Sequence, residues 1–201
     1  SNYNLNMNMI ADGHTGIEHS VPVNPIYKDA VGLWKNTKVG YTPTLIVAFG
    51  GLWGENYWYD RTNVWENEKL MSYTPNSVID SRARRRTTAE YGDYNHINVA
   101  KSAKLFSDNG TPVNLGAHGQ VQGLGAHWEL WMMAQGGFSP LESIRVATLN
   151  GAKYLGMDKE LGSLETGKLA DLIVMDENPL QDIRNSEKIK YVMINGRLYD
   201  S

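Results

Sequence analysis

Apolar residues recur along the chain with two spacings, one typical of amphipathic helices and one typical of buried strands. Spacings of three and four residues predict helices, and short runs rich in β-branched and aromatic residues predict strands. Helices are expected at residues 7–12, 26–34, 95–108, 128–135 and 139–155. Strands are expected at residues 16–20, 41–49, 113–115, 170–176 and 191–194, with Asn195-Gly196 as a hairpin turn into residues 197–199.

The order of these elements indicates a parallel α/β arrangement over residues 1–157. Strands alternate with helices there, as in a parallel sheet whose crossover helices cover both faces. Three such strands do not close a barrel. Residues 158–201 contain mainly strands, so a second, small β unit is expected there. The chain therefore has the pattern of one part of a larger fold.

Composition and charge narrow the classes of function. The chain has 201 residues, of which 41% are apolar and 20% are charged, and this balance is typical of a globular protein with one sizeable core. Its formal net charge of -3 gives no electrostatic reason to expect nucleic acid or an anionic membrane as partner. No apolar run approaches the roughly 20 residues that span a bilayer. The compartment stays open, since a cytoplasmic, periplasmic or secreted location depends on a missing N-terminus.

The histidines are the first candidates for chemistry, because the chain has no cysteine and a metal site must use His, Asp, Glu or carbonyl oxygens. His19 and His118 both follow predicted parallel strands, at the end where α/β barrels place their reacting groups. A histidine at a strand end is also often a structural, hydrogen-bonded residue, so both interpretations stand. His127 begins a helix and could face the same site. His14 in a turn and His96 near a helix start are expected at the surface.

The segment 50–92 mixes aromatic and polar residues and is expected to be a long loop. Trp53, Tyr57 and Trp58 could line a substrate pocket or form a lid over it, because an ordered loop of this length in a compact domain is often functional. A packed loop without a role in binding is the alternative. The basic run Arg82–Arg86 is typical of a solvated face or of a loop paired with acids.

Several motifs together resemble the amidohydrolase superfamily, in the branch that includes imidazolonepropionase-like and prolidase-like enzymes. Gly16-Ile-Glu-His19 and Tyr41-Thr-Pro-Thr-Leu45 are similar to the sixth and seventh barrel strands of that family. The downstream motifs are more specific: Ser139-Pro-Leu-Glu-Ser-Ile-Arg-Val-Ala-Thr148, Asn150-Gly-Ala152, Leu161-Gly-Ser-Leu-Glu-Thr-Gly-Lys-Leu-Ala-Asp-Leu-Ile-Val-Met-Asp176 and Asn178-Pro-Leu180. The resemblance covers about residues 9–199.

This resemblance implies a partial (β/α) barrel, the last three strand-helix units of a TIM-like barrel, over residues 1–157. It implies the C-terminal strands of a small β-sandwich over residues 158–201. In the family, a His-x-His pair, a carboxylated Lys or Glu and further His residues bind one or two divalent metal ions, usually zinc. This chain begins after most of those positions. It retains the sixth-strand ligand position, which falls on His19.

The eighth-strand position falls on His118 and departs from the family pattern. The family usually has Asp there in a Gly-Thr-Asp context, whereas this chain has Gly116-Ala-His118. An imidazole ligates a metal when neutral and accepts a proton near pH 7, but it brings no negative charge to the site. The resemblance therefore implies His118 as a metal ligand and as the catalytic group that takes a proton.

Two functions of different classes follow. In the first, the chain is the C-terminal part of a metal-dependent amidohydrolase that cleaves a C–N bond in a small-molecule amide or a dipeptide. It would be inactive alone, because two ligands are too few for a catalytic site. In the second, the chain is a non-catalytic scaffold or degenerate homologue that self-associates through exposed sheet edges. In both cases we expect a homo-oligomer or pairing with the missing N-terminal part.

Overall fold

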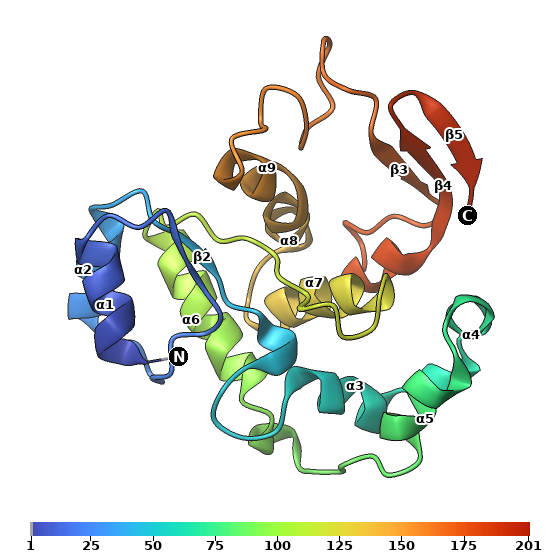
Figure 1. Cartoon of the computed structure of the whole chain (residues 1–201), viewed down its shortest axis with the longest axis horizontal. Helices are drawn as coiled ribbons and strands as arrows, with labels where there is room; N and C mark the ends of the chain where they lie inside the picture. The colour runs from blue at the N-terminus through green and yellow to red at the C-terminus, as the bar shows by residue number, and fades with distance from the viewer. Residues whose placement is uncertain (1) are drawn as a thin grey trace.

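The computed structural model describes residues 2–201 as a mixed α/β chain whose elements follow an open arc (Figure 1). α6 and α7 lie in the middle, α1 and α2 lie at one side, and β3–β5 lie at the other. The α-helices are α1 Tyr3–Ala11, α2 Lys28–Lys35, α3 Gly54–Arg61, α4 Glu68–Tyr73, α5 Asn76–Ala83, α6 His96–Asp108, α7 Leu124–Gln135, α8 Pro140–Arg145 and α9 Gly151–Tyr154. The strands are β1 Gly16–Glu18, β2 Gly40–Thr42, β3 Leu172–Met175, β4 Ile189–Ile194 and β5 Arg197–Asp200.

The parallel part of the fold consists of one strand pair and one bridge. β1 and β2 are parallel, with Gly16 opposite Gly40 and Glu18 opposite Thr42. On the other side of β2, Tyr41 forms an isolated parallel bridge with Val113. The predicted strand 113–115 is thus reduced to a single bridge. The order β1, β2, Val113 follows the chain, so the three segments end at the same edge. A partial barrel stays a prediction, because this pairing does not establish one.

The predicted strand 41–49 was too long. It ends at Thr42, and the chain then turns through Thr44, whose backbone has a left-handed φ of 53°, into the 3-10 helix η1 Leu45–Val47. The buried carboxylate of Glu129 on α7 accepts hydrogen bonds from the backbone N–H groups of Leu45 and Ile46, at 2.7 and 2.9 Å. A partner 83 or 84 residues away therefore satisfies donors that a longer strand would have used in the sheet.

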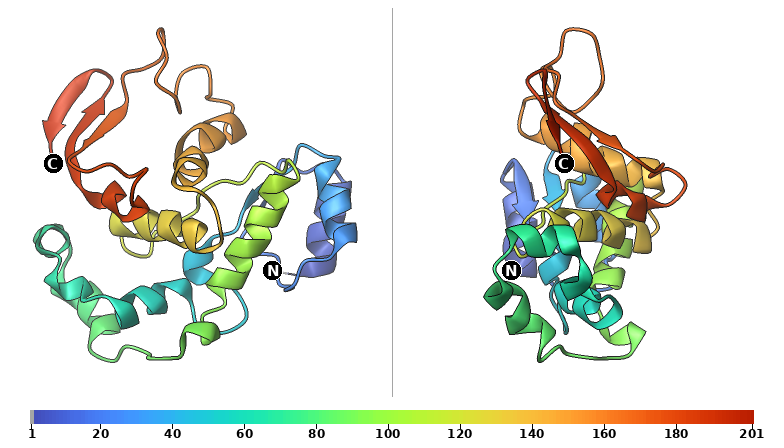
Figure 2. Two further views of the ribbon diagram at one scale, coloured as in Figure 1. Left: turned by 180° about the vertical axis from the view of Figure 1, so that it is seen from behind. Right: turned by 90° about the vertical axis from the view of Figure 1, so that its right-hand side faces the viewer.

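The segment 50–92 is a helical arm and not a loop. It contains α3, α4 and α5, together with the 3-10 helices η2 Val64–Glu66 and η3 Tyr91–Asp93. Seen from behind, these helices extend from α7 along one side of the molecule (Figure 2). Their aromatic residues explain the order: the ring of Trp58 stacks on Trp128 of α7 with the centroids 6.1 Å apart. Burying such large rings stabilises the arm against the core.

The centre of the core lies where α2, β2 and α6 meet. The rings of Trp34, Tyr41 and Phe106 pack against one another with centroid separations of 4.5–5.4 Å, and all three side chains are buried. The predicted helices 26–34 and 95–108 are confirmed as α2 and α6, because their apolar positions face this cluster.

The predicted helix 139–155 is confirmed as a continuous helical stretch. It begins with the capping box of Ser139 and Glu142, continues from α8 through the π-helix η4 Val146–Asn150, and ends with α9. Gly156 follows with a positive φ of 73°, which suits a helix stop. The capping pattern was readable from the sequence because both of its hydrogen bonds are local.

The C-terminal strands form a three-stranded antiparallel sheet in the order β3-β4-β5. Asn195 and Gly196 both have a positive φ, 48° and 79°, so the predicted hairpin turn is confirmed. Most side chains of the sheet are half-buried or exposed. The β-sandwich and the division into residues 1–157 and 158–201 stay predictions. Over residues 2–201, no helix combines the length and the apolar character needed to cross a membrane.

Candidate functional site

The three parallel segments end in the same unusual way. Beyond each end lies a residue other than glycine with a left-handed backbone: His19 after β1, Thr44 after β2 and His118 after Val113, with φ values of 68°, 53° and 54°. Such a conformation costs roughly 1–3 kcal/mol per residue, and residues held in it tend to cluster at functional sites. The strain is therefore concentrated at the edge where the sequence predicts the site.

His19 and His118 lie in contact at this edge. Their ring centroids are 5.1 Å apart and the rings are inclined by 65°, so one ring presents its edge to the other. Both side chains are exposed to solvent. The chain separates the two residues by nearly a hundred positions, and the parallel pairing of β1, β2 and Val113 brings them together.

This pair suits part of a metal site. Two adjacent, accessible imidazoles are the donor type that zinc and similar ions prefer, but a catalytic zinc site normally has three protein ligands and an open position. In the part of the chain that the structure describes, no group of three or more His, Asp or Glu side chains is placed to hold a metal. The two histidines therefore fit two coordination positions of such a site.

A hydrogen-bonded chain leads from His118 into the protein. Nδ1 of His118 lies 3.1 Å from Oε1 of Gln120, and Nε2 of Gln120 donates to Oε2 of Glu55 at 2.9 Å. The same oxygen of Glu55 forms an ion pair with Nε of Arg82, also at 2.9 Å. Glu55 is fully buried near the start of α3, whereas His118 is exposed. These contacts tie α3 and α5 to the loop that carries His118.

Sequence reasoning missed Glu55 and Gln120. The signal for Glu55 was weak: it is an acid among aromatic residues, two positions after Trp53. Nothing local indicated that its partner would be Gln120, because the two residues are 65 positions apart and meet only through the fold. Arg82 was expected to face solvent or to pair with acids, and it pairs with Glu55.

A tyrosine supports the end of β1 from the other side. The hydroxyl of Tyr154 on α9 donates to Oε1 of Glu18 at 2.7 Å, next to His19. Burial is the main cause that raises the pKa of Tyr154 to about 12, and the hydrogen bond to Glu18 is the second cause. The tyrosine therefore stays protonated as a donor at neutral pH. Its ring fills the space above Gly16 and Gly40, where a side chain would collide with it.

The three aromatic residues predicted to bind substrate have different surroundings. Trp53 is 46% exposed immediately before α3. Tyr57 is half-buried, with its ring 5.3 Å from that of Tyr94 and 5.1 Å from that of His96. Trp58 is only 4% exposed and packs in the core. The binding role of all three stays a prediction, and the accessible surface is greatest for Trp53.

Two further histidines lie elsewhere. The prediction that His96 is at the surface was wrong: it is fully buried at the start of α6, with Nε2 3.0 Å from Oε1 of Gln135. Burial lowers its pKa to about 4, while the contact with Gln135 has the opposite effect. His127 lies 3.0 Å from the hydroxyl of Ser186 through Nδ1. Burial, followed by the charge of Lys69, lowers the pKa of His127.

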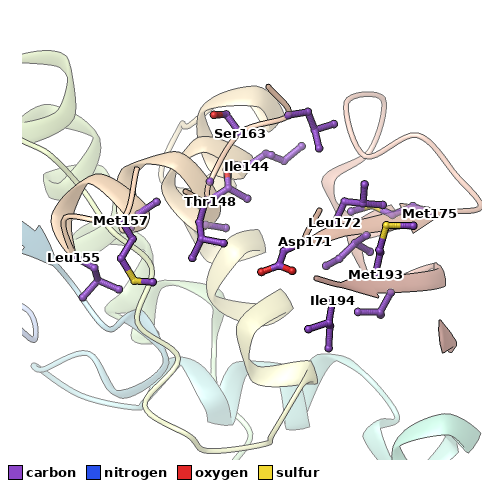
Figure 3. A pocket seen from close by; sticks show the side chains of 18 residues that line it. Ile144, Thr148, Leu155, Met157, Ser163, Asp171, Leu172, Met175, Met193 and Ile194 are labelled. Carbon is purple, nitrogen blue, oxygen red and sulfur yellow. The ribbon is translucent and has the colours of Figure 1, made fainter. Parts of the chain in front are cut away.

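A large apolar cavity lies at a different place, between the helical stretch α8–α9 and the strands β3 and β4. We call it the C-terminal hollow. Its volume is about 820 Å³. Figure 3 shows side chains such as Leu155 and Met157 on the helical side and Leu172 and Met193 on the sheet side. Most of its lining is apolar, and no histidine is among the lining residues. The polar side chains in the lining are Thr148, Ser163 and Asp171, so the hollow mainly offers apolar packing surface.

Comparison with known proteins identifies the family. The model of the amidohydrolase family matches residues 73–199, which is more than half of the chain. The chain therefore belongs to the amidohydrolase family, and the resemblance seen in its motifs is confirmed.

Three relatives illustrate the similarity. A 5-methylthioadenosine/S-adenosylhomocysteine deaminase of Moorella thermoacetica is 57% identical over 69 residues, covering 28% of this chain and 16% of the relative. An imidazolonepropionase of Symbiobacterium thermophilum is 49% identical over 39 residues, covering 19% of this chain and 9% of the relative. The structure of a Xaa-Pro dipeptidase with bound methionine is 26% identical with a TM-score of 0.65, covering 97% of this chain and 42% of that protein.

These matches also show how much of each relative the chain covers. It spans about two fifths of the length of the dipeptidase structure and smaller shares of the two curated relatives. What the relatives act on is therefore a property of longer proteins.

Proposed function

We propose that this chain supplies the His19–His118 half of the active site of a metal-dependent hydrolase that acts on carbon–nitrogen bonds. Membership of the amidohydrolase family supports the class of reaction. The single observation that carries the proposal is the contact between the two imidazoles, 5.1 Å apart at their centroids, on the edge where β1, β2 and Val113 end.

The two histidines have different roles in this proposal. His19 is a metal ligand. His118 is a ligand or the base that takes a proton from the attacking water, because an imidazole can do either near neutral pH. A bound divalent ion, of which zinc is the family's usual choice, would polarise the scissile carbonyl and lower the pKa of bound water from about 15.7 to about 7. Both residues have a left-handed backbone directly beyond the strand ends, which supports a functional role at this edge.

The substrate class follows from the relatives and from the aromatic arm. A Xaa-Pro dipeptidase and an imidazolonepropionase are among the similar proteins, so we propose a small-molecule amide or a dipeptide as substrate. Trp53 is the best placed of the three predicted aromatic residues to contact it, because it is exposed two residues before Glu55, which is linked to the His118 loop. Tyr57 and Trp58 would shape the pocket from behind through packing.

The remaining parts of the active site belong to a segment outside residues 2–201 in this proposal. The chain would form the last three strand–helix units of a (β/α) barrel and the C-terminal strands of a β-sandwich, and the missing N-terminal part would complete both. The C-terminal hollow supports this view, since apolar walls on α8–α9 and on the sheet lack a covering partner among the described residues. We therefore propose that the isolated chain is inactive.

Zinc titration of the isolated chain tests the proposal. We expect one zinc per chain in calorimetry, with binding weakened at least tenfold in His19→Ala and also in His118→Ala, because each loses half of the protein ligands. His14→Ala is the matched control, since His14 is exposed in a turn outside the pair. Unchanged zinc binding in both site variants would contradict the proposal.

A non-catalytic, self-associating scaffold is the second candidate. The exposed apolar side chains of the C-terminal sheet, among them Ile173 and Ile194, favour association with another chain. In this alternative His19 and His118 bind no metal ion, and zinc titration of the wild-type chain gives no stoichiometric binding. The same experiment therefore separates the two candidates.

A further inference from the structure

The side-chain amide of Gln120 stands between an exposed histidine and a buried carboxylate. Its Nε2 faces Oε2 of Glu55 at 2.9 Å, and its Oε1 faces Nδ1 of His118 at 3.1 Å. Glu55 is fully buried, and its other oxygen, Oε1, has no hydrogen-bond partner among the described residues. The amide is therefore the only polar link from this carboxylate toward the exposed edge that residues 2–201 provide.

The orientation of this amide follows from the chemistry of its partners. The Glu55 carboxylate, which already pairs with Arg82, presents only acceptor oxygens. The amide must therefore turn its NH₂ group toward Glu55, which leaves its oxygen toward His118. The opposite orientation would set two acceptors against each other beside a buried carboxylate, which is unfavourable because neither group can donate.

The oxygen of Gln120 in turn decides which nitrogen of His118 carries the proton. A carboxamide oxygen only accepts hydrogen bonds, so Nδ1 of His118 must be the donor. A neutral imidazole with the proton on Nδ1 has its lone pair on Nε2, and that lone pair is what binds a metal or takes a proton.

We propose that Glu55 is a positioning residue that, through Gln120, holds His118 in the tautomer with the proton on Nδ1 and the lone pair on Nε2. The use of that lone pair rests on the proposed function, whereas the tautomer itself does not. Arg82 contributes by fixing the carboxylate from the side of α5, and its own side chain is 36% exposed. The order of action is Arg82, Glu55, Gln120 and then His118.

Nitrogen NMR of the chain labelled with ¹⁵N-histidine tests this inference without any metal. In its neutral form, the His118 imidazole of the wild-type chain should show a protonated Nδ1 and an unprotonated Nε2. In Gln120→Met, which keeps the side-chain length but loses both hydrogen bonds, the population should move toward the tautomer with the proton on Nε2. Glu55→Met should produce a shift in the same direction, because the amide is then free to turn.

Two features keep the test decisive. Gln120 is half-buried in a loop, so Gln120→Met remains informative if loss of the buried Glu55 unfolds the chain. Glu55→Gln is the conservative variant: its amide oxygen can still accept from Gln120, so it should retain the wild-type tautomer. The signals of His96, which is held by Gln135, provide an internal control: they should not change in Gln120→Met or Glu55→Gln, and a change in Glu55→Met would report unfolding.

The outcomes for the tautomer and for the proposed function are separable. A wild-type His118 with its proton on Nε2 overturns the inference, and so does a tautomer that is the same in wild type, Gln120→Met and Glu55→Met. If the tautomer behaves as proposed but the chain binds no zinc, the proposed function fails while the positioning role of Glu55 stands.

Discussion

Among single residues, Glu129 is the clearest case of a buried acidic side chain with a structural task. Its two carboxylate oxygens accept the backbone N–H groups of Leu45 and Ile46, directly after the turn at Thr44. Those two donors would otherwise be buried without partners, which costs about 1–3 kcal/mol each. Glu129 therefore fixes the path of the chain beyond β2, close to the edge that carries His19 and His118.

The protonation of Glu129 gives a prediction for stability against pH. The ordinary pKa of a Glu side chain is 4.5, and burial raises the pKa of Glu129 to about 8 in the folded chain. The hydrogen bonds from the N–H groups of Leu45 and Ile46 act in the opposite direction but are the smaller effect. Between these values the folded chain binds a proton that the unfolded chain has released. The free energy of unfolding should therefore fall as the pH rises from 4.5 to about 8, by at most about 1.4 kcal/mol per pH unit.

Urea denaturation between pH 6.5 and 8 is the appropriate measurement. His96 acts in the opposite sense, but only at lower pH, because burial moves its pKa from 6.5 down to about 4. Glu129→Gln should be less stable than wild type, but its free energy of unfolding should no longer fall with pH between 6.5 and 8. Equal slopes in both proteins would show that Glu129 does not titrate there.

The candidate residues differ in how far the sequence could reveal them. His19 and His118 were predictable because each follows a recognisable strand, and parallel strands deliver their ends to one edge. Glu55 and Gln120 were not, because their contact joins residues 65 positions apart. His96 looked exposed because one turn of helix gives no sign of burial from a distant helix, α7 in this case.

Among the elements, α9 packs closely against the two parallel strands β1 and β2, through the ring of Tyr154. A Cβ atom on Gly16 would lie 2.0 Å from the hydroxyl oxygen of Tyr154, and one on Gly40 would lie 2.8 Å from its ring. Only glycine leaves room for this tyrosine, whose hydroxyl also holds Glu18 beside His19.

Substitution of two glycines tests this packing. Gly16→Ala should destabilise the chain by about 1–3 kcal/mol, because the ring of Tyr154 must move. Gly32→Ala is the matched control: it lies inside α2 with no atom within 4 Å of an added Cβ, so it should gain about 0.5–1 kcal/mol of helix propensity. Urea midpoints measure both effects. A Gly16→Ala protein as stable as Gly32→Ala would mean that this contact is loose.

The sequence predicted the elements whose signals are local and missed those that depend on distant contacts. Helices such as α2 and α6 were found because their apolar period is local, and the β4–β5 hairpin was found because Asn195-Gly196 determines its turn. The strand 41–49 was overestimated, and the arm 50–92 was taken for a loop. In both segments, contacts with α7 decide the structure, and those contacts have no local signature.

At the scale of the whole molecule, the open arc leaves apolar surface without cover. The C-terminal hollow includes Ile173 and Ile194, which are 49% and 57% exposed on the sheet. Surfaces of this kind associate in water because contact removes apolar area from solvent. The three parallel segments led to the expectation of one part of a larger fold, which stays a prediction. That expectation did not locate the uncovered apolar surface between α8–α9 and β3–β4.

Sedimentation velocity tests this consequence. We expect the wild-type chain to sediment as a species larger than its monomer mass of 22.5 kDa. The double variant Ile173→Lys and Ile194→Lys should shift the distribution toward the monomer, because two charges disfavour burial of the hollow. Leu5→Lys changes an equally exposed residue on α1, outside the hollow, and should leave the distribution as in wild type. A compact wild-type monomer would contradict the prediction.

We propose that His19 and His118 hold one metal ion together, and zinc-edge anomalous diffraction from crystals of the chain grown with zinc is the decisive measurement. We expect one strong anomalous peak, bonded to a ring nitrogen of each histidine at about 2.0–2.1 Å. A pair of histidines without zinc, in crystals that bind the ion at another place, would contradict it.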